Sequence, residues 1–202
     1  MNLLLILMLL SPQEDPSLTD MPEGWVSGKK SGWDGDYPPG WPEKTDEEKK
    51  KFLTQWNNAK FRYINFMKGA KGTPTGGVTA ILFMLKAVNA GLGINQAADL
   101  TMFGQNSKLK EADFKIMLKA ASSVFGTEVP HGEAVNITKD IVTTGLRGSA
   151  LDQRVRAEIT KKNQQLLEAK ARKEKEAKEN EGKKEEGDKK DGDKKDGGGK
   201  KE

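Results

Sequence analysis

The spacing of apolar residues from position 45 to about position 180 predicts helices throughout this region. The first predicted helix follows Thr45, which lies three residues before Glu48 and so fits a capping box. The helix ends at Gly69, and its apolar side, close to the 3.6-residue period, contains Phe52, Trp56, Ala59, Tyr63, Ile64 and Met67. A second helix is expected to begin at Thr73-Pro74, because proline suits the first helical position. Its predicted apolar stripe consists of Val78, Ile81, Leu82, Leu85 and Val88.

Further helices are predicted over roughly 95–103, 108–125 and 132–144, and a last one starts near Ser149. Glycines follow four of the predicted helices and are expected to adopt the left-handed conformation that ends a helix: Gly91, Gly104, Gly126 and Gly145. In the last helix the apolar stripe stops at Leu167, and only spaced charges follow. We therefore expect this helix to project into solvent and to fray before Gly182.

These elements predict an all-α fold, namely a compact bundle of about six helices over residues 45–167. No stretch shows the alternation of apolar and polar residues that a strand requires. The glycine stops are 13, 22 and 19 residues apart, which is too uneven for a strict repeat array. A solenoid of stacked helix pairs is the alternative architecture.

Residues 1–11 contain an uninterrupted apolar run from Leu3 to Leu10. Eight residues are too few to span a bilayer, which takes about twenty in a helix. The run resembles the apolar region of a secretory signal peptide, so we predict an exported protein, periplasmic or extracellular. No Lys or Arg precedes the run, and no clear cleavage site of small residues follows it. The alternative is a short apolar helix that packs on the domain.

Residues 12–44 form a segment rich in glycine, proline and tryptophan. Six of the eight prolines fall here, which excludes a helix and predicts an extended arm. Trp25, Trp33 and Trp41 each follow a glycine and recur every eight residues. A tryptophan carries a large apolar area, so these rings either dock on the helical domain as a strap or form a binding surface. The three tryptophans are the candidate binding residues of this chain.

The charge of the chain is concentrated in residues 168–202, which we interpret as a charged helix extension followed by a disordered tail. The whole chain has 34 Lys and Arg against 30 Asp and Glu, and residues 161–202 hold 15 against 12. Near the end, Gly-Asp-Lys-Lys-Asp occurs twice, so each lysine pair is flanked by acids. A nucleic-acid-binding tail works through unopposed positive charge. This low-complexity composition therefore favours a solvated polyampholyte over a nucleic-acid-binding segment.

The chain offers few groups for catalysis or metal binding. Without cysteine there is no thiol nucleophile and no Cys-based zinc site, and the one histidine makes a multi-His metal centre implausible. His131 opens a predicted helix, where a surface residue is the favoured interpretation over a base assisted by Glu128 or Glu133. The loop from Gly72 to Gly77 lacks the Gly-Lys-Ser/Thr of a phosphate-binding loop. We predict no enzyme activity, no catalytic residue, no metal site and no cofactor.

Three short motifs carry a resemblance. They are Gly-Lys-Lys-x-Gly-Trp over 28–33, Pro-Pro-Gly-Trp over 38–41, and Gly-Leu-Arg-Gly-x-x-Leu over 145–151. The first two are similar to the N-terminal segments of uncharacterised exported bacterial proteins, in which they precede a helical region. The third looks like the turn that opens the last helix of those proteins. The resemblance implies no known activity, so no functional residue can be carried over.

The leading hypothesis is a non-enzymatic exported helical module that binds or organises a protein or cell-envelope partner. One alternative is a nucleic-acid-binding protein that uses the lysine-rich C-terminus. Another is a cell-envelope polysaccharide-binding protein or enzyme that uses the tryptophan arm as a stacking surface.

Overall fold

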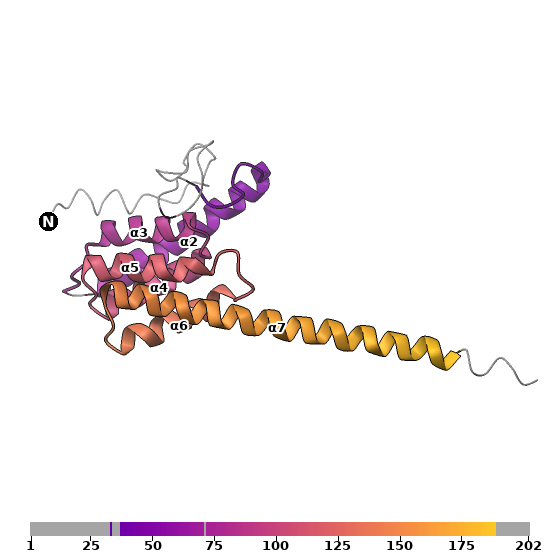
Figure 1. Cartoon of the computed structure of the whole chain (residues 1–202). Coiled ribbons are helices and arrows are strands. Elements are labelled where there is room, and N and C mark those ends of the chain that lie inside the picture. The colour runs from indigo at the N-terminus through magenta and orange to yellow at the C-terminus, as the bar shows by residue number, and fades with distance from the viewer. Residues whose placement is uncertain (1–32, 34–36, 71, 189–202) are drawn as a thin grey trace, which may run out of the picture.

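A computed structural model of the chain describes residues 33, 37–70 and 72–188, with the side chains of 179–188 excepted. This part of the chain is all-α and contains no strand (Figure 1). Its helices are α2 (Asp46–Gly69), α3 (Gly77–Asn89), α4 (Ile94–Asn106), α5 (Glu111–Ala121), η1 (a 3-10 turn, Ser122–Val124), α6 (His131–Thr143) and α7 (Gly148–Asp188). The predicted all-α bundle is confirmed. The predictions for residues 1–11, for Trp25 and for the tail after 188 lie outside the described residues.

Two helices, α4 and α5, lie at the centre of the bundle. Helix α4 packs against α2, α3, α5 and α6, while α5 packs against α3, α6 and α7. The buried side chains of all these helices, together with Trp33, Tyr37 and Trp41, belong to one hydrophobic cluster, so the helices share one core. Its fully buried side chains include Leu100, Phe114, Met117 and Leu118.

Helix α2 begins with the predicted capping box. The backbone N–H of Glu48 donates to Thr45 Oγ1 at 3.2 Å, and the backbone N–H of Thr45 donates to Glu48 Oε2 at 2.8 Å. Both hydrogen bonds satisfy backbone donors that have no partner within the helix. The hydrogen bonds from Thr45 also hold the pKa of the Glu48 carboxyl below its ordinary value.

Helix α3 differs from its prediction in both its start and its buried face. It begins at Gly77 rather than at Thr73-Pro74. The predicted stripe places Val78 and Leu82 in the core, yet they are 59% and 47% exposed. Leu85 and Val88 of the predicted stripe are buried as expected, and the core side further comprises Ala80, Phe83, Met84 and Ala87. The helix has only one charged residue, Lys86. Its polar residues are therefore too few to mark which side faces solvent.

Helix α4 does not end at Gly104, which corrects the prediction of a cap there. The helix continues to Asn106, and the left-handed residue that follows is Lys108, with φ of 50°. Gly104 is buried at the crossing with α5. A Cβ atom at this position would lie 2.7 Å from Met117 Cε and 2.7 Å from Phe114 Cε2. The glycine is needed for the close approach of two helices, not for a turn.

The other three glycines are left-handed as predicted, although Gly126 follows the 3-10 turn η1, because α5 spans Glu111–Ala121 rather than the predicted 108–125. Gly91, Gly126 and Gly145 have φ angles of 94°, 77° and 88°. After α3, the backbone N–H of Leu92 donates to the carbonyl of Ala87 at 3.0 Å, as in a Schellman cap. Leu92 is itself buried, so the residue after the glycine packs back on the helix.

Helix α7 has two halves, a packed half over 148–166 and a projecting half over 167–188. The packed half buries Leu151, Val155 and Ile159, whereas every side chain from 167 to 178 is exposed. Figure 1 shows the projecting half, orange turning to yellow, running away from the bundle as a continuous helix. Its backbone is helical through Gly182 to Asp188, and the expected fraying before Gly182 stays a prediction. Among the described helices, α7 included, none combines the length and the hydropathy that crossing a membrane requires.

Candidate functional site

The candidate binding residues Trp33 and Trp41 are both buried, at 8% and 2% exposure. Trp41 lies in a turn whose backbone is held by a 3.1 Å hydrogen bond from its N–H to the carbonyl of Pro38. Gly40 takes the left-handed conformation in this turn, with φ of 69°. The Trp41 ring then packs edge-on against Phe52 of α2, with the ring centroids 5.7 Å apart. The turn thereby joins the arm to the first turns of α2.

A surface that stacks on a ligand needs exposed ring faces, and these two rings expose little area. Trp25 lies outside the described residues, so the three tryptophans are not seen together. The burial of Trp33 and Trp41 fits the interpretation of the arm as a strap. A binding role for Trp25, Trp33 and Trp41 stays a prediction.

His131 is the first residue of α6, and it is partly buried rather than fully at the surface. Its Nδ1 accepts a hydrogen bond from the backbone N–H of Gly93 at 2.9 Å. Gly93 is the residue that precedes α4, so the imidazole links the starts of two helices. Nδ1 can accept this bond only when it carries no proton. Burial also lowers the pKa of His131, which favours the neutral ring.

A buried polar cluster joins the end of α4 to α2 and to the loop before α3. Gln105 Nε2 donates to the hydroxyl oxygen of Tyr63 at 2.7 Å and to the carbonyl of Thr75 at 3.1 Å. Thr75 Oγ1 in turn donates to the carbonyl of Leu109 at 3.0 Å. Burial raises the pKa of Tyr63, and the hydrogen bond from Gln105 opposes this only in part. The tyrosine is therefore a neutral partner in a contact between elements.

Sequence reasoning missed this cluster. The apolar period places Tyr63 among the apolar residues of its helix, and the predicted cap at Gly104 places Gln105 beyond the end of α4. Because α4 in fact continues past Gly104, Gln105 is carried into the core on the same helix. A polar residue near a helix end ordinarily faces solvent, so only the packing of α4 against α2 reveals its role.

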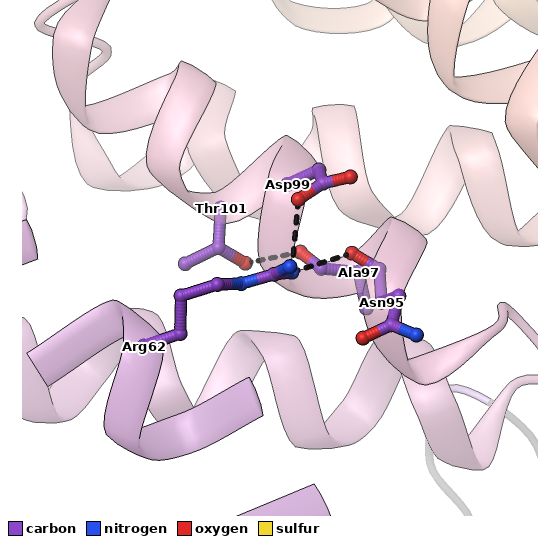
Figure 2. A network of polar contacts seen from close by, with 5 residues as sticks. All are labelled: Arg62, Asn95, Ala97, Asp99 and Thr101. Atoms are coloured by element: carbon purple, nitrogen blue, oxygen red, sulfur yellow. Dashed lines mark hydrogen bonds and ion pairs between the residues drawn. The ribbon is translucent and has the colours of Figure 1, made fainter. Parts of the chain in front are cut away.

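An exposed ion pair joins α2 to α4, as Figure 2 shows. Arg62 Nη2 donates to Asp99 Oδ1 at 2.9 Å and to the carbonyl of Asn95 at 3.3 Å. Both charged side chains are 46% exposed. On α4 itself, Thr101 Oγ1 donates to the carbonyl of Ala97 at 2.7 Å (Figure 2). Asp99, interpreted from sequence as a solvated charge, thus also contacts a neighbouring helix.

Polar contacts also fix helix α7 to the bundle. At its start, the backbone N–H of Gly148 donates to Asp113 Oδ1 of α5 at 2.8 Å. Further along, Lys162 pairs with Glu133 of α6 at 2.6 Å. The loop before α6 contributes two contacts through one residue, Glu128. Its backbone N–H donates to Asn163 Oδ1 at 2.8 Å, and its carboxylate pairs with Lys170 at 3.3 Å.

Apart from Thr101, whose hydrogen bond lies within α4, each of these polar groups joins two elements of the fold. Among the described side chains, in residues 33, 37–70 and 72–178, no three His, Asp or Glu side chains are grouped as metal ligands would be. Comparison of the chain with protein families, curated proteins and solved structures finds no match. The projecting half of α7 presents contiguous exposed side chains from 168 to 178.

Proposed function

We propose that the protein is a non-enzymatic exported helical module that binds or organises a protein or cell-envelope partner. The observation that carries this proposal is the projecting half of α7. A helix anchored by burial of Leu151, Val155 and Ile159 continues far beyond its last packed turn. Exposed helical surface of this length contributes nothing to the core, and it offers an elongated contact surface outside the bundle.

The charges of the projecting half indicate how such a partner would be recognised. Over 168–178 it holds five Lys or Arg and three Glu, all exposed. A partner with a complementary mixture of charges would bind through many weak pairs, and salt would weaken the complex. The acids interspersed among the lysines disfavour the nucleic-acid alternative, because they oppose attraction to phosphate.

Two further observations support the other parts of the proposal. His131 and Tyr63, which could in principle transfer protons, are both engaged in hydrogen bonds that join helices. This supports a structural rather than a catalytic use of these groups. Export is supported by the apolar run from Leu3 to Leu10 and by the resemblance of the Gly-Lys-Lys-x-Gly-Trp segment to exported proteins.

Proximity labelling in the cells that make the protein tests the binding part. Three chains are compared: the full chain, a chain that ends after Asp188, and a chain that ends after Lys170. The first two should label the same protein or envelope partner, and the shortest should lose it while its bundle still unfolds cooperatively. Equal labelling by all three chains would show that the projecting half does not present the contact.

Cell fractionation combined with intact mass measurement tests export separately. We expect the protein in the periplasm or the medium. A protein found wholly in the cytosol, with Met1 retained, would overturn this part of the proposal and leave the binding part standing.

A further inference from the structure

We infer that residues 171–188 of α7 form a self-supporting helical spacer, which extends from the bundle in a fixed direction. Lys170, paired with Glu128, makes the outermost contact between α7 and the bundle among the described side chains. From there the helix continues to Asp188. At 1.5 Å per residue this stretch is about 27 Å long. The inference deepens the proposed function, since a rigid spacer would set where the partner lies relative to the bundle.

A helix without tertiary contacts usually melts because its first turn is costly to form. In α7 that first turn is already stabilised by packing, since Leu151, Val155 and Ile159 fix the helix within the bundle. The projecting half therefore only has to propagate an existing helix. Each added residue gains one backbone hydrogen bond, and no new nucleus is needed.

The sequence of the projecting half favours propagation. Three of its residues are alanines, the best helix former, at positions 169, 171 and 177. Oppositely charged residues lie four apart and so share one side of the helix in Glu168 with Arg172 and in Glu174 with Lys178. Both pairs have the acid on the N-terminal side, which is the more favourable orientation. No glycine, proline or β-branched residue occurs between 168 and 181.

The same charges keep the spacer away from the bundle. Between 168 and 178 the only apolar side chains are those three alanines, so folding back would bury almost no apolar area. It would instead remove charged groups from water, which is unfavourable. Gly182 and Gly187 lie in the outermost turns. The spacer is therefore expected to be stiffest before Gly182.

A distance measured between two spin labels on the full chain tests this inference. The chain has no cysteine, so labels can be attached at Thr160→Cys on the packed half and Lys184→Cys on the spacer. A continuous helix places the two backbone sites about 36 Å apart. If the chain were a coil beyond residue 170, their separation would be about 26 Å with a broad distribution. A narrow distribution near the longer value is expected, and a broad one near the shorter value would overturn the inference.

A matched pair of substitutions tests whether charge pairs stiffen the spacer. Glu174 lies four residues from both Lys170 and Lys178, so Glu174→Gln removes the negative charge from two pairs of oppositely charged residues. Lys173 has alanines four residues away on both sides, and its neighbours three residues away, Lys170 and Glu176, have opposite signs. We expect Glu174→Gln to broaden and shorten the distribution and Lys173→Gln to leave it unchanged. Equal effects of the two substitutions would overturn the role of the charge pairs.

Labels at Ser149→Cys and Gln165→Cys, both within the packed half, provide the internal reference. Their separation of about 24 Å should stay narrow in every variant. These distances are measured without a partner. A broad distribution would therefore overturn the spacer even if proximity labelling of the partner still required residues 171–188. Conversely, a rigid spacer with no dependent labelling would overturn the proposed function alone.

Discussion

The packed and projecting halves of α7 belong to one continuous helix, yet different forces stabilise them. The packed half buries a leucine, a valine and an isoleucine four residues apart against α5 and α6. The projecting half buries nothing from 168 to 178 and relies on helix propensity and charge spacing. The same secondary structure therefore does not imply the same sensitivity to substitution. A substitution at a packed position should lower the free energy of unfolding, whereas a substitution at an exposed position should change it little.

The largest expected effect comes from truncating a leucine in the packed half. Leu151 is fully buried, so Leu151→Ala loses burial and leaves a cavity, lowering the free energy of unfolding by about 2–5 kcal/mol. Leu167 lies on the same helix but is exposed, so Leu167→Ala should cost less than about 1 kcal/mol. Urea unfolding followed by circular dichroism measures both values. Equal losses would contradict the distinction between the halves.

Glycine-to-alanine substitutions should change stability in opposite directions depending on packing. Gly104→Ala would place a Cβ against Phe114 and Met117 at the α4–α5 crossing, and we expect a loss of about 1–3 kcal/mol. Gly132, in the first turn of α6, has open space where a Cβ atom would lie, with nothing within 4 Å, so Gly132→Ala should gain up to about 1 kcal/mol. Thermal unfolding of the two variants measures whether each gains or loses stability. A stabilising Gly104→Ala would show that the crossing can accommodate a methyl group.

Stability should also depend on pH through His131. Because the pKa of His131 is lowered in the folded state, the unfolded chain binds a proton first as the pH falls. The stability contributed by the neutral ring is present above the unfolded pKa of about 6.5 and decreases as the pH drops below it. Protonation also removes the acceptor of the Gly93 N–H.

Urea unfolding between about pH 5.5 and 7.5 measures this dependence, since most carboxylates titrate at lower pH. The substitution His131→Gln retains a side-chain acceptor but does not titrate, so its stability should stay level over this range. A slope that persists in His131→Gln would assign the pH dependence to another group.

Features set by local chemistry could be predicted from the sequence. The capping box of Thr45 and Glu48 and the left-handed glycines at Gly91, Gly126 and Gly145 depend only on neighbouring residues, and the structure confirms all of them. The capping box forms because the first backbone N–H groups of a helix need an acceptor that few side chains provide. The glycines are required because few other residues adopt a positive φ angle. Both ends of α2 and of α6, and the start of α7, lie within one residue of their predicted positions.

Features set by packing between helices could not be predicted in this way. Gly104 has the same sequence signature as a cap, but its role is decided by Phe114 and Met117 on another helix. Helix α3 is apolar on nearly every side, so the exposure of Val78 and Leu82 depends on which neighbours surround it. The hydrogen bonds of the buried Gln105 and the Gly93 contact of His131 likewise join residues more than 25 positions apart.

The smallest expected effect concerns Arg62 and Asp99, an exposed pair that nevertheless joins two helices. Since both side chains are 46% exposed, water and salt screen their attraction, and their coupling should stay below about 1 kcal/mol. A double-mutant cycle with Arg62→Met and Asp99→Asn measures the coupling, and its value should fall further in about 1 M salt. A coupling above about 2 kcal/mol that resists salt would mean that exposure alone does not make a position tolerant. Exposed positions would then tolerate substitution, as expected for the projecting half of α7, only where the side chain contacts no second helix.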